Sequence, residues 1–104
     1  AYMAWFDAGV GAILQKLEDI GADENTIVIL TSDHGLWRHG KATLYDGGLR
    51  VPMIVRWPSA GQAGRRYGEL ISSIDFAPTV LDVAEITPPA DAAIDGRSYR
   101  AVLE

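Results

Sequence analysis

A short polar run, Thr31-Ser32-Asp33-His34-Gly35, directly follows a continuous apolar segment of the chain. A carboxylate beside an imidazole can share one divalent metal ion, and a glycine at the end of the run allows the backbone to turn sharply away. The same residues also suit a structural role, in which Asp33 caps a turn and His34 forms a local hydrogen bond. The run by itself therefore leaves metal binding and turn formation as alternatives.

The distribution of charge places a basic section beside this run. Residues 1–35 and 69–104 each carry a net charge of −5, whereas residues 36–68 hold six basic side chains against one acid, a net charge of +5. A small anion site requires such a local excess, although a basic surface loop would show it equally well. The overall charge of −5 argues against general nucleic-acid binding, which depends on neutralising phosphates.

Composition excludes several other classes of protein. With no cysteine, the chain has no disulfide, no thiolate zinc site and no cysteine nucleophile. No apolar run approaches the ~20 residues of a membrane helix, and no signal peptide opens the sequence. At 104 residues the chain is at most one domain, and because it begins at Ala1 in the middle of a pattern, we expect it to be part of a longer protein.

Two elements are expected to position the polar run. Apolar side chains recur at three- and four-residue spacing over residues 3–20, which predicts an amphipathic helix that ends at Gly21. Residues 26–31 are β-branched and apolar on both faces, as is typical of a buried strand in a parallel sheet covered by helices. Asp33 and His34 would then lie beyond the carboxyl end of that strand, where ligands bind in open α/β sheets. The predicted fold class is α/β.

Two more elements follow a polar, glycine-rich stretch. Residues 49–57 predict a second strand, and Pro52 favours an edge position or a strand start. After a further loop, Asp75 or a neighbour is expected to cap a helix that has Pro78 in its first turn and ends before a pair of prolines.

Six short motifs occur in order along nearly the whole sequence. They are Glu24-Asn25-Thr26; Thr31-Ser32-Asp33-His34-Gly35; Gly40-Lys41 through Tyr45-Asp46-Gly47-Gly48; Leu49-Arg50-Val51-Pro52 into Arg56-Trp57-Pro58; Asp75-Phe76-Ala77-Pro78-Thr79; and Asp95-Gly96-Arg97-Ser98. In these motifs and in their order along the sequence, the chain resembles the sulfatase family of the alkaline-phosphatase superfamily. The resemblance implies that residues 1–104 are a carboxyl-side part of the catalytic domain. It also implies a partial alkaline-phosphatase-like sandwich, with a mostly parallel sheet flanked by helices.

The resemblance also implies roles for individual residues. Asp33 and His34 match the family's second pair of divalent-metal ligands, for which Ca²⁺ is the expected ion and Mg²⁺ or Mn²⁺ are alternatives. Lys41 matches the lysine that contacts the sulfate oxygens and the nucleophile, so it is the expected catalytic and substrate-binding residue. His39 is a further candidate for substrate binding because it is close to Lys41 in the sequence and could face the same pocket, although no family role transfers to its position.

Other matched positions are expected to be structural. Arg50 and Asp75 correspond to recurrent family positions, and for Arg50 we expect a salt bridge buried behind the site. Glu85 stands where the family commonly has glycine, and we expect it to change the end of its helix. The short loop between Gly35 and Lys41 is similar to that of the heparan N-sulfatase-like branch.

The implied activity is metal-dependent hydrolysis of sulfate esters or sulfamates. Family members use a formylglycine made from Cys or Ser in a Cys/Ser-x-Pro-x-Arg motif, which these 104 residues lack. The formylglycine is therefore expected elsewhere in the protein, and residues 1–104 alone are expected to be inactive. Two alternatives remain: a phosphonate or phosphate ester hydrolase of the same superfamily, which would differ in its nucleophile, and a non-catalytic remnant that binds anions.

The expected partners are a sulfated small molecule or glycan and the rest of the catalytic domain, with no nucleic acid and no membrane. The residues themselves do not indicate a compartment, and by family habit the protein is expected to be periplasmic, secreted or lysosomal.

Overall fold

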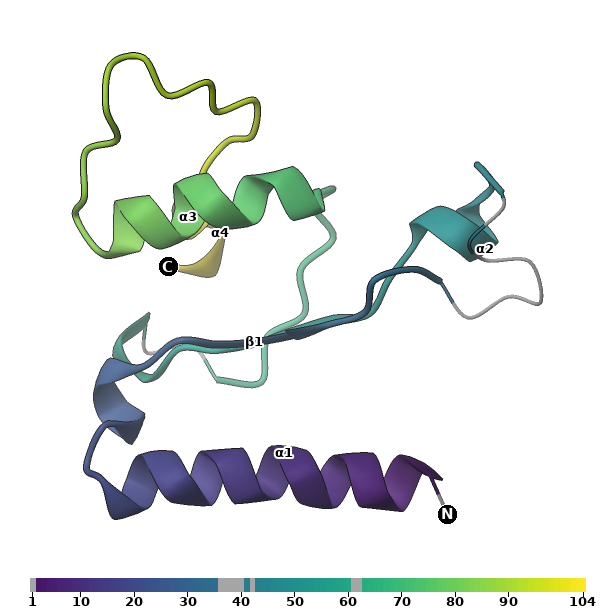
Figure 1. The fold of residues 1–104 in the computed structure, drawn as a ribbon, viewed down its shortest axis with the longest axis vertical. Coiled ribbons are helices and arrows are strands. Elements are labelled where there is room, and N and C mark those ends of the chain that lie inside the picture. Colours follow the sequence, from purple (N-terminus) through teal and green to yellow (C-terminus); the bar gives the residue numbers. More distant parts are fainter. Residues whose placement is uncertain (1, 36–40, 42, 61–62) are drawn as a thin grey trace. The chain divides into compact units, whose positions relative to one another are not determined.

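The computed structural model describes residues 2–35, 41, 43–60 and 63–104, which belong to two compact units, Ala1–Ser59 and Ala60–Glu104. The elements in chain order are α1 (Tyr2–Asp19), η1 (Asp23–Asn25), β1 (Val28–Thr31), α2 (Asp46–Leu49), β2 (Met53–Arg56), η3 (Pro58–Ala60), η4 (Ser73–Asp75), α3 (Phe76–Val83) and α4 (Arg100–Leu103) (Figure 1). Helices and strands alternate, which confirms the α/β class. None of the helices in the described ranges has the length and apolar character needed to cross a membrane.

Helix α1 confirms the helix predicted over residues 3–20, including the position where it ends. The N–H of Gly21 donates to the carbonyl of Glu18 (2.9 Å), and the N–H of Ala22 donates to that of Leu17 (2.9 Å). These two bonds form a Schellman cap, in which the residue after the helix adopts a left-handed conformation. Gly21 has a φ of +66°, which glycine adopts without a clash from a Cβ atom.

Strands β1 and β2 pair in antiparallel register, from Val28 opposite Arg56 to Thr31 opposite Met53. The sequence predicts that residues 26–31 belong to a parallel sheet. For the pairing of β1 with β2, the one that the described residues show, this prediction is wrong. A continuous apolar run predicts that a strand is buried on both faces, but it does not predict the direction of the neighbouring strand. Direction follows here from the connection, because α2 lies at the end of β1 and returns the chain from that same end (Figure 1).

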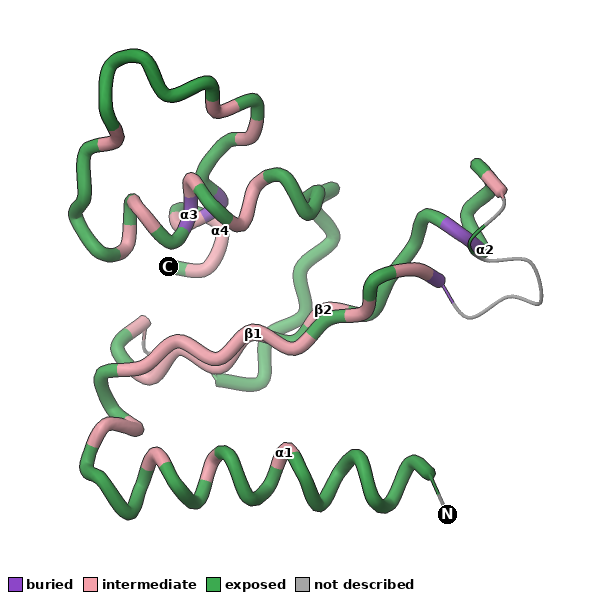
Figure 2. The backbone as a smooth tube through the Cα atoms, viewed as in Figure 1, coloured by how far each residue is buried: buried purple, intermediate pink, exposed green. Residues whose placement is uncertain are grey.

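The strands are half-buried, and most of α1 is exposed (Figure 2). The side chains of Tyr2, Trp5 and Ile13 on α1 are 90%, 79% and 62% exposed. Several exposed large apolar side chains on one helix are typical of a contact with other protein. The isolated chain is therefore expected to aggregate or to require a partner.

Asp75 joins two segments of the C-terminal unit, as expected for a structural residue. Its Oδ2 accepts from the N–H of Ser72 (2.8 Å), and its Oδ1 accepts from the N–H of Arg97 (2.9 Å). These two hydrogen bonds hold the pKa of the Asp75 carboxyl below its ordinary value, and the bond from the N–H of Arg97 has the larger effect. Beside this junction, a Cβ on Gly96 would lie 2.1 Å from the carbonyl oxygen of Ile74, so only glycine allows the close approach.

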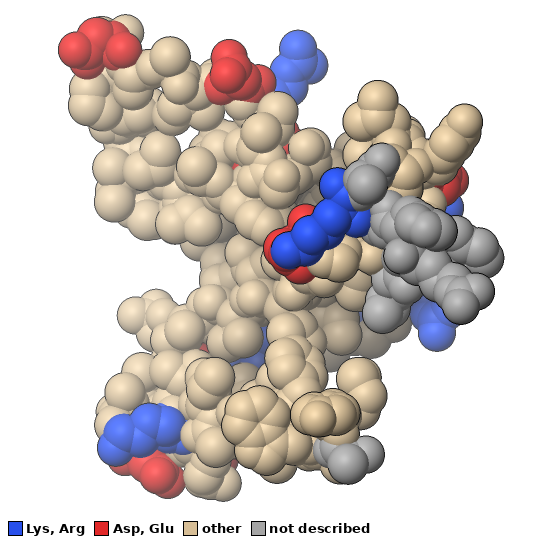
Figure 3. Space-filling model, turned by 45° about the vertical axis from the view of Figure 1, so that its right-hand side comes forward, with Lys and Arg blue, Asp and Glu red and all other residues tan. Residues whose placement is uncertain are grey.

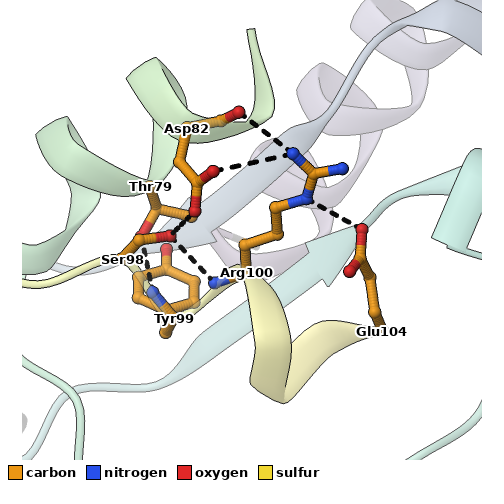
Figure 4. A network of polar contacts seen from close by, with 6 residues as sticks. All are labelled: Thr79, Asp82, Ser98, Tyr99, Arg100 and Glu104. Atoms are coloured by element: carbon orange, nitrogen blue, oxygen red, sulfur yellow. Dashed lines mark hydrogen bonds and ion pairs between the residues drawn. The ribbon is translucent and has the colours of Figure 1, made fainter. Parts of the chain in front are cut away.

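A polar network then fastens the end of the chain to α3 (Figure 4). The buried hydroxyl of Thr79 accepts from the N–H of Tyr99 (3.0 Å), whose ring is also buried. Ser98 Oγ donates to Asp82 Oδ2 (2.5 Å), and Arg100 Nη1 donates to the carbonyl of Asp82 (3.1 Å). These contacts place the small core of this unit between α3 and α4.

The expectation that Glu85 changes the end of its helix is wrong, because α3 keeps a left-handed cap. Glu85 has a φ of +56°, its N–H donates to the carbonyl of Asp82 (3.1 Å), and the N–H of Ile86 donates to that of Leu81 (2.8 Å). The hydrogen bonds of the Schellman cap are thus formed without glycine, and the strain of a left-handed conformation falls on a residue with a Cβ atom.

Glu85→Gly is expected to stabilise the protein by about 1 kcal/mol, because it removes that strain. The measurement is the urea midpoint at constant m value. Gly21→Ala is the matched control, since it introduces the same strain at the cap of α1 and should lower the midpoint. An unchanged midpoint for Glu85→Gly would show that the left-handed cap costs nothing at this position.

Asp75→Asn is expected to flatten the acid dependence of stability. Because the pKa of Asp75 is lowered in the folded state, its contribution is fully present well above pH 3.8 and is lost as the pH falls through the folded pKa. The variant should be less stable than wild type at neutral pH and lose less stability on acidification. Urea midpoints measured between pH 7 and pH 2 test this, with exposed Asp91→Asn in the same unit as control. Parallel curves for wild type and Asp75→Asn would contradict it.

Candidate active site

The polar run after β1 is held in place by a backbone contact with α2. The N–H of Gly35 donates to the carbonyl of Gly48 (3.0 Å), and both glycines are buried. A Cβ on Gly35 would lie 2.1 Å from the carbonyl oxygen of Gly47, so no larger residue fits against this helix. The contact between Gly35 and the pair Gly47-Gly48, here called the glycine clamp, fixes the backbone that carries Asp33 and His34.

The structure brings together three of the four predicted site residues. Lys41 Nζ lies 3.2 Å from Asp33 Oδ2, and His34 Nε2 lies 3.7 Å from Asp33 Oδ1. The carboxylate therefore stands between an ammonium group and an imidazole. Acidic and basic side chains also touch on the face shown in Figure 3. The fourth residue, His39, lies outside the described residues.

Lys41 stabilises the ionised form of Asp33. Its hydrogen bond to the carboxylate is the largest cause that holds the pKa of Asp33 below its ordinary value, and the charge of His34 acts in the same direction. Asp33 is therefore ionised at neutral pH. The side chains of Asp33 and Lys41 are both 71% exposed, so a ligand can reach them from solvent.

The hydrogen bonds of His34 determine which ring nitrogen is free. Its Nδ1 lies 2.8 Å from the carbonyl oxygen of Gly35, which only accepts, so Nδ1 carries the proton. In the neutral ring, Nε2 then has a free lone pair and lies on the side of Asp33. Ser32 Oγ donates to the carbonyl of His34 (2.9 Å) and steadies the same turn. Turn formation and metal binding are thus compatible roles for these residues.

This donor set fits part of the coordination shell of a divalent metal ion. Metal–ligand distances of about 2.0–2.6 Å allow two donors 3.7 Å apart to share one ion. A carboxylate oxygen suits Ca²⁺ or Mg²⁺, and an imidazole nitrogen is also a good ligand for Mn²⁺. Among residues 2–35, 41, 43–60 and 63–104, no third His, Asp or Glu joins the pair.

The salt bridge expected for Arg50 is present, but it is not buried. Arg50 Nε lies 3.4 Å from Asp46 Oδ2, and the two side chains are 75% and 82% exposed. The two residues are four apart at the ends of α2, a spacing that favours a pair on the helix surface. The expectation of a buried pair is therefore wrong in the described part of the chain.

The glycine clamp is the part of the site that sequence reasoning missed. The sequence pattern predicts only a turn at Gly35, and it includes Gly47-Gly48 only as part of a motif. Two adjacent glycines beside a polar run are a usable signal, because glycine often marks a close approach of two backbone segments.

The fold and the site together define an α/β protein that presents a carboxylate, an imidazole and an ammonium group beyond the end of a strand. Residues 1–86 match the family model described as Sulfatase. The chain belongs to the sulfatase family.

Relatives with curated descriptions extend this match over almost the whole chain. The steryl-sulfatase of Rattus norvegicus is 37% identical over 115 residues, which cover 93% of this chain and 20% of the relative. The N-acetylglucosamine-6-O-sulfatase of Bacteroides thetaiotaomicron is 42% identical over 103 residues, which cover 94% of this chain and 18% of the relative. The chain therefore spans about a fifth of the length of these relatives.

Two solved structures confirm the expected alkaline-phosphatase-like fold. One is a protein in complex with its substrate D-glucosamine-2-N,6-O-disulfate, with a TM-score of 0.70 and 37% identity over 94% of this chain and 20% of that chain. The other is a phosphonate monoester hydrolase from Silicibacter pomeroyi, with a TM-score of 0.71 and 35% identity over 93% of this chain and 20% of that chain.

Proposed function

We propose that this chain is part of a metal-dependent hydrolase of sulfate esters or sulfamates. In this proposal Asp33 and His34 supply part of the metal site, and Lys41 binds the sulfate group. The observation that carries the proposal is the contact of Lys41 with Asp33 beside the free Nε2 of His34, in a chain that belongs to the sulfatase family.

The chemistry of sulfate-ester hydrolysis agrees with these residue types. The reaction develops negative charge on the oxygens around sulfur, and fixed positive charge close to those oxygens lowers the barrier. The Lys41 ammonium is a point charge suited to such oxygens, and its high exposure leaves it free to meet them. When bound, a divalent ion such as Ca²⁺, Mg²⁺ or Mn²⁺ supplies Lewis-acid charge at the same place.

Asp33 and His34 are arranged to hold such an ion. Asp33 is ionised at neutral pH, and Lys41 lowers its pKa further. The hydrogen bond that His34 Nδ1 donates to the carbonyl of Gly35 orients the ring so that the lone pair of Nε2 is free to bind the ion. His39 is proposed as a further substrate-binding residue because it lies two residues before Lys41 in the sequence. A formylglycine nucleophile would lie outside these 104 residues, which alone are expected to be inactive.

The proposed substrate is a sulfated small molecule or glycan. One similar structure holds D-glucosamine-2-N,6-O-disulfate as its substrate, and one relative is an N-acetylglucosamine-6-O-sulfatase. A sulfated amino sugar is therefore the first substrate class to test.

A phosphonate monoester hydrolase is the second candidate, because a protein with that activity matches this chain with a TM-score of 0.71. The test is to assay the full-length gene product on 4-nitrophenyl sulfate and on 4-nitrophenyl phenylphosphonate. A higher kcat/KM on the sulfate supports the proposal. A preference for the phosphonate would assign the second candidate, and no turnover of either ester would favour a non-catalytic anion-binding protein.

A further inference from the structure

Two basic side chains in the basic section, residues 36–68, take no part in the site described above. Within that section, three others have acidic partners: Lys41 pairs with Asp33, Arg50 with Asp46 and Arg56 with Asp23. Arg65 and Arg66 form no ion pair with any residue that the structure describes, and both are exposed. Their two positive charges are therefore available to a ligand.

These arginines line an open hollow of about 430 Å³ in the C-terminal unit. Tyr67 and Glu69 continue the same wall, and Ala101 of α4 lies in the lining as well. The hydroxyl of Tyr67 donates to the carbonyl of Leu103 (3.3 Å), which ties this wall to α4. The side chain of Tyr67 remains 40% exposed.

The lining suits a ligand that carries both anionic groups and hydroxyl groups. A guanidinium group binds the oxygens of a sulfate or carboxylate through two parallel hydrogen bonds. Glu69 can accept hydrogen bonds from hydroxyl groups, and the exposed ring of Tyr67 offers a flat apolar surface. A sulfated sugar combines these properties.

We propose that Arg65, Arg66 and Tyr67 form a second, non-catalytic binding site for a sulfated oligosaccharide. The choice of a sulfated sugar rests on the proposed function. The site itself uses residues of the C-terminal unit, whereas Asp33, His34 and Lys41 belong to the N-terminal unit.

The test measures the Kd of a heparin oligosaccharide for the full-length gene product by titration calorimetry. All variants carry Lys41→Ala, so that binding through that lysine does not contribute. Adding Arg65→Ala and Arg66→Ala is expected to raise the Kd by about tenfold or more, since two charge-assisted contacts are lost. Adding Arg65→Lys and Arg66→Lys should raise it less, because the charge is kept and the fork geometry is lost.

Lys16→Ala is the control for net charge, because Lys16 lies on α1 in the other unit. It should leave the Kd within about twofold of its parent. An unchanged Kd in the double alanine variant would overturn the proposal, as would an equal effect of Lys16→Ala. Failure of the proposed function is seen separately, as an absence of sulfate-ester turnover in the wild-type protein with heparin binding retained.

Discussion

Replacing Lys41 with alanine is expected to lower kcat/KM of the full-length gene product for an aryl sulfate by about a hundredfold or more, which is the usual cost of one transition-state contact. The ammonium of Lys41 lies 3.2 Å from Asp33 Oδ2, and in the proposed function it binds the sulfate group, whose oxygens gain negative charge in the transition state. Within these 104 residues the one other lysine is Lys16, which lies on α1.

Lys16→Ala is the matched control for this experiment, since it removes the same charge from the last turn of α1. Its kcat/KM should stay within about twofold of wild type, because an exposed charge outside the site contributes little. The ratio of the two variants separates a specific contact from the effect of net charge. A kcat/KM for Lys41→Ala equal to that of wild type would show that Lys41 is a surface residue without a part in the reaction.

Gly35→Ala is expected to destabilise the protein by about 2 kcal/mol or more and to abolish the site. The new methyl group would lie 2.1 Å from the carbonyl oxygen of Gly47, and both partners are backbone atoms that cannot rotate away. Either α2 or the end of β1 must move, and such overpacking typically costs 1–3 kcal/mol. Because Gly35 follows His34 directly, the movement should also weaken metal binding.

Gly11→Ala is the control for Gly35→Ala. Gly11 lies within α1, and an added Cβ there meets no atom within 4 Å. Alanine in a helix interior should raise stability by about 0.5–1 kcal/mol, so the two substitutions should have opposite signs. Urea midpoints measure both effects. If Gly35→Ala unfolds at the wild-type midpoint, the glycine clamp does not hold the site.

Local patterns predicted most of the fold correctly. The spacing of apolar residues located α1, Gly21 marked its end, and Pro52 stands directly before β2. The direction of β2 could not be predicted, because strand pairing depends on where the connection returns. Nor did the sequence show how far the strands are buried, since their apolar faces are only partly covered by the chain itself.

The site was predicted in its residue types and only partly in its geometry. The motif match placed Asp33, His34 and Lys41 together, and the Asp33 carboxylate does lie within 4 Å of both His34 and Lys41. The role of Gly47 depends on a contact with Gly35, twelve residues away; the adjacent glycines signal a close approach of backbones but do not name the partner. The exposed pair of Arg50 and Asp46 was misjudged because burial is a property of the packed structure.

Calcium binding to the full-length gene product tests the central claim most directly. After treatment with a chelator, the wild-type protein is titrated calorimetrically beside Asp33→Asn, His34→Ala and the exposed control Asp7→Asn. We expect wild type and Asp7→Asn to bind one ion with the same Kd. We expect the Kd of Asp33→Asn and His34→Ala to rise by at least about tenfold, since each loses a ligand. Equal affinity in all four proteins would contradict the assignment of Asp33 and His34 as metal ligands.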